Sequence, residues 1–260
     1  MMKNTINTIL FTLCLVLVRA QSPAEIINTW ADAEQWKHAH VGIALHDINS
    51  GLLIAGYNHD KCFVPASSLK VLSSFATLDL LGKDFTYKTV LAYDGQIVDS
   101  VLTGNVYVIG SGDPSLASKR YADKLNFSEL PGYLASKIST AGIRKIEGKI
   151  ICDESCFDSF PIAPSWQWND LGSNYACGAW GININENEYD IWYNTRHELG
   201  DTAELLTITP DIPSLTLSNE VIIDEENTGD NSYIFGGPYD FEKRIVGTLP
   251  KDRQNYRIKG

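Results

Sequence analysis

The sequence predicts a mixed α/β protein, and three parts of the chain support this fold class. Residues 22–82 carry a helix pattern, then alternating apolar side chains, then a second helix pattern. Residues 86–157 place one helix between several short strands, and residues 203–260 have the pattern of short strands separated by turns. No internal repeat or low-complexity linker is present. Helices and strands are therefore expected to alternate along most of the chain.

The first predicted helix spans residues 22–39, in which Ser22 is placed to cap the N-terminus and Pro23 suits the first turn. Residues 41–58 follow with the sequence "VGIALHDINSGLLIAGYN". Alternating apolar side chains on both sides of "DINSG" predict two strands joined by a turn. A helix and a hairpin are thus expected ahead of the second helix.

The second predicted helix lies within "FVPASSLKVLSSFATLDLLG", residues 63–82. Pro65 precedes it, and Gly82 is well placed to end it. Its apolar side chains recur at helical spacing, and we expect them to form a buried stripe: Leu69, Leu72, Phe75, Ala76 and Leu80. This helix is therefore expected to pack one face against the rest of a domain.

The segment from residue 86 begins with strands that end in a Gly-rich loop. Residues 127–143 then predict a helix with Pro131 in its first turn, and residues 145–157 return to a strand pattern. Residues 164–189 are rich in Trp, Gly and Asn, so we expect loop-like structure there. The chain is thus expected to change from mixed α/β to β-rich near residue 160.

The composition argues against one class of partner. The formal net charge is −11 and the isoelectric point is about 4.8. Binding to the phosphates of nucleic acid requires clustered Lys and Arg, and the sequence has no such basic patch. We therefore expect no nucleic acid partner.

The N-terminus has the pattern of a secretory signal peptide. Lys3 supplies a positive charge, residues 9–18 form an apolar run, and "VRA" ends in a small residue that a signal peptidase prefers. We expect cleavage before Gln21, which makes residues 1–20 the leader. The apolar run is too short to span a bilayer comfortably, and no later stretch is long enough, so the exported protein is not expected to span a membrane.

Four cysteines follow this leader: Cys62, Cys152, Cys156 and Cys177. In an oxidising compartment an even number permits two disulfides, although the sequence does not fix their pairing. Zinc binding is the alternative, but the chain contains no Cys-x-x-Cys and the spacings are scattered. His38 and His40 point to different faces of the expected helix, which favours solvated side chains. No metal site is therefore expected.

Ser67 and Lys70 are three residues apart at the start of the second helix, so their side chains share one face. A serine hydroxyl there lies among free backbone N–H groups at the positive end of the helix dipole, which favours a nucleophile. A lysine can accept the proton when burial or a neighbouring cation lowers its pKa towards neutrality, because part of it is then unprotonated. A capping Ser and a solvated Lys give the same spacing, so the motif alone is weak. The helix and hairpin before it favour the acyl-enzyme chemistry of penicillin-recognising serine enzymes.

Similarity to such enzymes extends beyond this motif. The segments that carry it keep one order along the chain: "LDLLGKDFTYKT" (78–89), "LTGNVYVIGSGDPSL" (102–116), "AGIRKIEGKIICDESCFD" (141–158), "PSWQWNDLGSNYACGAWGININENEY" (164–189) and "VGTLP" (246–250). On these segments the chain resembles the D-alanyl-D-alanine carboxypeptidase/endopeptidases of peptidase family S13, the class C low-molecular-mass penicillin-binding proteins. The resemblance covers most of residues 24–260.

The resemblance implies a β-lactamase/transpeptidase-like domain with two domains inserted after the Ser-x-x-Lys helix. The expected boundaries are 21–84 for the first part of the transpeptidase-like domain and 85–160 for an inserted α/β domain. Residues 161–260 are expected to hold a second inserted, β-rich region and the start of the return to the transpeptidase-like domain.

The resemblance also implies a periplasmic enzyme that cleaves the D-Ala-D-Ala end of peptidoglycan stem peptides, and often the cross-link between stems. β-Lactams would acylate it, and no metal or organic cofactor would be needed. By position, Ser67 matches the nucleophile and Lys70 its base. Asp153 matches a family aspartate near the cleft that meets the amine of the substrate's diamino acid. Without the resemblance, the position of Asp153 at the end of a predicted strand favours a residue that caps a turn. Asp113, in "GSGDPSL", is expected to form a turn rather than to catalyse.

Two further motifs of this family, Ser-x-Asn and Lys-Thr-Gly or Lys-Ser-Gly, do not occur in the sequence. The Lys-Thr-Gly strand supplies an oxyanion-hole N–H, and losing one such donor costs on the order of 100- to 1000-fold in rate. We interpret the chain as the N-terminal part of a D,D-peptidase that is inactive alone and exposes apolar surface on its first elements. The alternative is a non-catalytic peptidoglycan-binding remnant. A class A β-lactamase is disfavoured because the long stretch after Lys70 contains no Ser-x-Asn.

Overall fold

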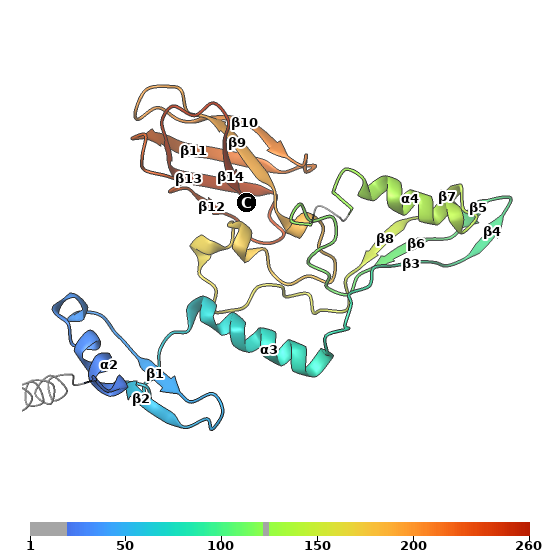
Figure 1. The fold of residues 1–260 in the computed structure, drawn as a ribbon. Helices are drawn as coiled ribbons and strands as arrows, with labels where there is room; N and C mark the ends of the chain where they lie inside the picture. Colours follow the sequence, from blue (N-terminus) through green and yellow to red (C-terminus); the bar gives the residue numbers. More distant parts are fainter. Residues whose placement is uncertain (1–19, 122–124) are drawn as a thin grey trace, which may run out of the picture. The chain divides into compact units, whose positions relative to one another are not determined.

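A computed structural model describes residues 20–121 and 125–260 (Figure 1). The chain forms two compact units that divide between Phe85 and Thr86. The expected signal peptide lies almost entirely in residues 1–19, outside the described residues.

Over its described residues, 20–85, the first unit contains a helix, a two-stranded hairpin and a second helix, joined by 3-10 turns. Its elements are α2 (Pro23–Ala31), η1 (Glu34–Trp36), β1 (Ile43–His46), β2 (Leu53–Tyr57), η2 (Ala66–Ser68) and α3 (Leu69–Leu81). β1 and β2 pair antiparallel, and Asp47 accepts the N–H of Ser50 at 2.7 Å in the turn between them. The hairpin expected from the alternating pattern is therefore confirmed.

The helix α2 begins as expected but ends well before residue 39. Ser22 and Glu25 form reciprocal capping hydrogen bonds, each accepting the backbone N–H of the other at 3.2 and 2.8 Å. The helix ends at Ala31 because Asp32 leaves the helical backbone conformation, with φ −88° and ψ 3°. The Tyr57 hydroxyl donates to the Asp32 carboxylate at 3.0 Å, which links this end of the helix to β2.

The apolar stripe of α3 is exposed, which contradicts the expectation that it would be buried. None of the residues of α3 is buried, and Leu72 and Phe75 are each 68% exposed. Helical spacing does gather apolar side chains on one side, but no other described element of the first unit covers that side. Gly82 ends the helix as expected, with φ +77° and its N–H on the carbonyl of Leu78 at 3.0 Å.

The second unit begins with six short strands in two three-stranded sheets and one helix. The strands are β3 (Val90–Tyr93), β4 (Gln96–Val98), β5 (Val101–Thr103), β6 (Val106–Ile109), β7 (Lys145–Glu147) and β8 (Ile150–Asp153). β6 pairs antiparallel with β3 and parallel with β8, and β5 pairs in the same way with β4 and β7. The helix α4 (Leu130–Thr140) lies in the crossover between the parallel strands, with Pro131 in its first turn as expected (Figure 1).

The rest of the second unit is irregular chain followed by a β-sandwich. The irregular part contains η3 (Trp168–Asp170), η4 (Asn174–Ala176) and η5 (Asn185–Asn187), in agreement with the expected loop-like structure. The strands are β9 (Asp190–Asn194), β10 (Glu204–Thr209), β11 (Thr216–Asp224), β12 (Tyr233–Phe235), β13 (Glu242–Pro250) and β14 (Tyr256–Lys259). They form sheets in the orders β10-β9-β14 and β11-β13-β12. The expected domain boundary near residue 160 stays a prediction.

The two sandwich sheets enclose the larger hydrophobic core. Ile191 of β9 and Ile245 of β13 have no exposed surface, and both belong to this cluster. A smaller core contains Leu102 and Val106, against which Ile138 of α4 packs. The second unit therefore has its own buried cores, whereas α3 of the first unit contributes none of its side chains to one.

We predict that Ile245→Ala destabilises the chain by about 2–5 kcal/mol, because it removes buried methylene groups and leaves a cavity. Urea unfolding followed by circular dichroism measures the change. The matched control is Ile150→Ala, since Ile150 also lies on a strand but is 65% exposed. Equal losses for the two substitutions would contradict the position of the core.

Candidate active site

The segment from Pro65 to Lys70 forms a continuous turn that brings the two candidate catalytic side chains together. The 3-10 turn η2 runs directly into α3, and Lys70 Nζ donates to Ser67 Oγ at 3.2 Å. Ala66 has φ +44°, a conformation that costs energy for a residue with a Cβ. The hydroxyl of Ser68 donates to the Pro65 carbonyl and closes the turn. Backbone strain of this kind is concentrated at functional sites.

The Ser67–Lys70 contact joins an amine to a serine hydroxyl with the spacing that nucleophile activation requires. For attack, the proton must pass from Oγ to an unprotonated amine. Both side chains are exposed. Acyl transfer depends on preorganised donors in a water-excluded site. Ser67 and Lys70 therefore stay the predicted nucleophile and base, and acyl transfer at this pair would require further groups around them.

A shallow apolar groove lies along α3 beside the candidate base. Lys70, Val71, Ser74, Phe75 and Leu78 line it. Val71 and Leu78 are 61% and 54% exposed, so the groove is open to solvent. The surface next to the Ser67–Lys70 pair is therefore apolar, which suits packing by protein more than binding of a polar substrate.

Asp153 lies at the C-terminal end of β8 in the second unit. Its carboxylate accepts the N–H of Ser155 at 3.0 Å. Hydrogen bonds from the side chain and then the backbone of Ser155 hold the pKa of Asp153 below its usual range. Asp153 is therefore an ionised, half-buried carboxylate that caps a turn. That arrangement leaves it able to attract an amine.

Asp113 forms the turn that its sequence context predicts. Its carboxylate accepts the backbone N–H of Ser115 at 2.8 Å and the Ser115 hydroxyl at 2.7 Å. His38 and His40 are both exposed, as expected for solvated side chains. Over residues 20–121 and 125–260, no group of three or more His, Cys, Asp or Glu side chains is placed to hold a metal ion.

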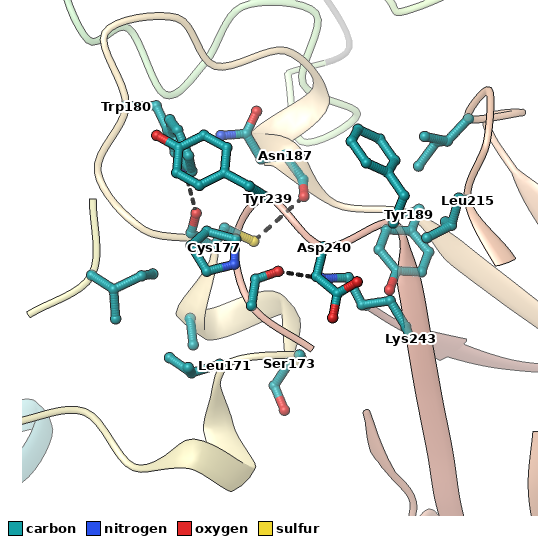
Figure 2. A pocket seen from close by; sticks show the side chains of 18 of the residues that line it. Leu171, Ser173, Cys177, Trp180, Asn187, Tyr189, Leu215, Tyr239, Asp240 and Lys243 are labelled. Carbon is teal, nitrogen blue, oxygen red and sulfur yellow. Dashed lines mark hydrogen bonds between the residues drawn. The ribbon is translucent and has the colours of Figure 1, made fainter. Parts of the chain in front are cut away.

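A cavity of about 460 Å³ in the second unit was not predicted from the sequence (Figure 2). Most of its wall is apolar, with Leu171, Trp180 and Leu215 among the lining side chains. The Tyr189 hydroxyl is buried without a hydrogen-bond partner among the described residues, and burial raises its pKa to about 12. Lys243 is half-buried and donates to the Gly237 carbonyl at 2.6 Å, and desolvation lowers its pKa. No local pattern indicates this cavity because its walls come from distant segments.

Cys177 lines the same cavity but lacks the properties of a catalytic thiol (Figure 2). Its Sγ donates to the carbonyl of Asn174 at 2.9 Å. Burial, and then the charge of Glu188, raise its pKa to about 11. A thiol with such a pKa stays protonated at neutral pH, and the thiolate is the reactive form.

The four cysteines after the expected leader are all free thiols in the structure. Cys62, Cys152 and Cys156 are exposed, whereas Cys177 is half-buried. The two disulfides that an even number permits are not formed here. The environment of Cys177 distinguishes it from the other three.

Comparison with known proteins places these features in a family context. The family model described as "D-Ala-D-Ala carboxypeptidase 3 (S13) family" matches residues 23–258. Among curated proteins, the D-alanyl-D-alanine carboxypeptidase DacB of Haemophilus influenzae is 30% identical over 149 residues, which are 57% of this chain and 29% of that protein. The D-alanyl-D-alanine carboxypeptidase of Actinomadura sp. strain R39 is 25% identical over 48% of this chain and 21% of its own length.

Solved structures agree with the sequence comparison. The crystal structure of penicillin-binding protein 4 (dacB) from H. influenzae matches with a TM-score of 0.66 and 25% identity, covering 84% of this chain and 46% of that one. A structure of the same protein complexed with a β-lactam matches with a TM-score of 0.60 at 21% identity. The mixed α/β fold expected from the sequence is therefore confirmed. The chain spans less than half of the length of these relatives.

We predict that iodoacetamide at pH 8 alkylates the reduced, folded protein rapidly at three cysteines and slowly at Cys177. The reason is that a pKa of about 11 leaves very little thiolate at this pH. Peptide mass spectrometry over time measures each site, and the rate at Cys177 should rise as the pH approaches 11. Cys177→Ser is the control and should leave the three fast reactions unchanged. Four equal rates at pH 8 would contradict the prediction.

Proposed function

Because this chain belongs to the D-Ala-D-Ala carboxypeptidase 3 (S13) family, we propose that it carries the nucleophile and base of a serine D-alanyl-D-alanine carboxypeptidase/endopeptidase. Its substrates are peptidoglycan stem peptides, and β-lactams acylate it. The observation that carries this proposal is the 3.2 Å contact between Lys70 Nζ and Ser67 Oγ at the start of α3. This chemistry uses side chains alone, without a metal or an organic cofactor.

The proposed reaction has two steps. Ser67 Oγ attacks the carbonyl carbon of the penultimate D-Ala, while Lys70 takes the hydroxyl proton. The C–N bond to the terminal D-Ala breaks, and that residue leaves as an amine after receiving a proton. Water then hydrolyses the ester on Ser67, which releases the shortened stem and restores the hydroxyl. A β-lactam enters the first step in the same way, because attack opens its ring and leaves an ester on Ser67.

Asp153 is proposed as a specificity residue within this function. Its carboxylate is ionised, since its hydrogen bonds to Ser155 keep the pKa low. An ionised carboxylate attracts the side-chain amine of a diamino acid in the stem peptide. It would therefore select substrates without taking part in bond cleavage.

The proposal includes low activity for residues 21–260 by themselves. These residues contain no Ser-x-Asn and no Lys-Thr-Gly or Lys-Ser-Gly. The exposure of Ser67 and Lys70 supports the same view, because acylation needs two oxyanion donors that converge on one carbonyl. The missing motifs also support a second candidate, a non-catalytic peptidoglycan-binding protein.

Export to the periplasm, with cleavage before Gln21, is part of the proposal and is supported by the leader pattern. Among the helices of residues 20–121 and 125–260, none combines the length and the apolar character needed to cross a bilayer.

We predict that fluorescent penicillin labels residues 21–260 poorly. A chimaera extended with the Ser-x-Asn and Lys-Thr-Gly segments of a related enzyme should become labelled at Ser67, because those segments supply the missing donors. Gel fluorescence and peptide mapping measure the label. Ser67→Ala should abolish it, whereas Ser139→Ala, at an exposed position of α4, should keep it.

Two results would overturn this assignment. Stoichiometric acylation of residues 21–260 at Ser67 would disprove the need for further groups. Labelling of the extended chimaera at another serine would disprove the nucleophile. If the folded chimaera takes no label but still binds peptidoglycan, the non-catalytic function is favoured.

We predict that Asp153→Asn in the same chimaera lowers the rate of D-Ala release from stem peptides with a free side-chain amine by about tenfold. This factor corresponds to ~1.4 kcal/mol. Acylation by benzylpenicillin should be unchanged. Chromatography of released D-Ala measures the first rate, and penicillin labelling measures the second. Asp158→Asn is the matched control, since Asp158 also caps a turn by accepting the N–H of the residue two positions later. Equal losses on both substrates would reject a role in selection.

A further inference from the structure

Three aromatic rings form a row on one face of the second unit. Tyr233 and Phe235 project from the same face of β12, with ring centroids 6.5 Å apart and planes inclined by 27°. Trp168 of η3 continues the row, 6.5 Å from Phe235 at 26°. Tyr233 is 46% exposed and Trp168 is 59% exposed. We call these three near-parallel rings the aromatic row.

A polar cavity of about 440 Å³ adjoins this row. Tyr233 lines the cavity and also begins the row, so the two features are continuous. The other polar side chains of its wall include Asn174, Asp230, Asn231 and Arg257. This wall differs from the largely apolar wall of the cavity around Tyr189.

Several polar groups of this cavity have unused hydrogen-bonding capacity. The guanidinium of Arg257 lies 5.9 Å from the Trp192 ring centroid and makes no hydrogen bond or ion pair with the described residues. Asp230 uses Oδ1 to accept the N–H and hydroxyl of Ser232, at 2.9 and 2.6 Å, which leaves Oδ2 available. Asn231 donates its amide to Thr228, which leaves its side-chain carbonyl free. Donors and acceptors are thus both present for a ligand.

The charges around the cavity are balanced. Arg257 contributes one positive charge and Asp230 one negative charge, while the ammonium of Lys259 is paired with Glu188. A strongly anionic ligand would be repelled by the Asp230 carboxylate and by the overall charge of −11. A wholly apolar ligand would leave the polar wall without partners. The wall therefore fits a ligand without net charge that offers both hydroxyl groups and apolar faces.

We propose that the polar cavity and the aromatic row form a saccharide-binding site that accepts a glycan strand. The C–H faces of successive pyranose rings pack on Tyr233, Phe235 and Trp168, while sugar hydroxyls bond to Asp230 and Arg257. Binding at this site is chemically independent of the proposed acyl-enzyme reaction, since holding a glycan does not require Ser67. Only the polymer used in the test, the glycan of peptidoglycan, is chosen on the basis of the proposed function.

The test measures binding of the full chain to two probes without net charge: oligosaccharides of N-acetylglucosamine, and glycan strands from amidase-treated peptidoglycan whose lactyl carboxylates have been converted to amides. Calorimetry and tryptophan fluorescence should show saturable binding. We expect an affinity loss of about tenfold, which corresponds to ~1.4 kcal/mol, for each of three variants: Tyr233→Ser, Trp168→Ala and Arg257→Gln. Trp168→Phe should retain most of the affinity and lose the fluorescence change, because it keeps an aromatic face.

Matched variants separate this site from general effects. Tyr133→Ser on α4 is the control for Tyr233→Ser, because Tyr133 is 48% exposed and lies outside the site. Ser67→Ala should bind glycan like the unchanged protein, even if penicillin labelling fails. Absence of saturable binding would overturn the proposal, and so would equal losses for Tyr133→Ser and Tyr233→Ser. Binding of released stem peptides that depends on Tyr233 would also overturn it, by assigning the site to peptide.

Discussion

The exposed apolar face of α3 is the constraint on which the candidate active site depends. Burial of a Leu, Val or Phe side chain contributes about 1.5–3 kcal/mol, and several such side chains on this helix are more than half exposed. Catalytic groups hold their geometry when surrounding packing locks their rotamers. Whatever covers α3 would therefore also fix Ser67 and Lys70. The local turn sets the distance between Ser67 and Lys70. Packing against the apolar face of α3 would set the orientation of the two side chains toward a substrate.

In the second unit, hydrogen bonds and ion pairs to Glu188 hold the irregular segment in place. Glu188 receives hydrogen bonds from Lys259 of β14 and from Asn174 of η4, and Arg120 reaches it from another loop at 3.4 Å. Although burial opposes ionisation, these hydrogen bonds keep the pKa of Glu188 below its usual range. One ionised carboxylate thus joins three segments. Because Asn174 and Lys259 also line the polar cavity, this network stiffens the wall of the proposed saccharide site.

Local features could be predicted from the sequence, and features that depend on distant segments could not. Gly82 ends α3 and Ser67 contacts Lys70, because residues three or four apart on a helix determine both results. The burial of α3 was predicted wrongly, since periodicity identifies an apolar face without identifying what covers it. Trp168 and Phe235 meet only through the fold, so no spacing indicated the aromatic row. For Asp153, the turn follows from the neighbouring residues, whereas its proposed role in substrate selection rests on the family.

The two proposed sites would serve one substrate in different ways. Bond cleavage needs groups that act more strongly on the transition state than on the bound substrate, and this is the role proposed for Ser67 with Lys70. A glycan site supplies uniform binding, which leaves the chemical barrier unchanged. Because both proposed sites lie on one chain and many stem peptides hang from one glycan, binding of the polymer would raise the effective concentration of stems near the proposed nucleophile. The aromatic row would thus improve capture at low substrate concentration without replacing any catalytic group.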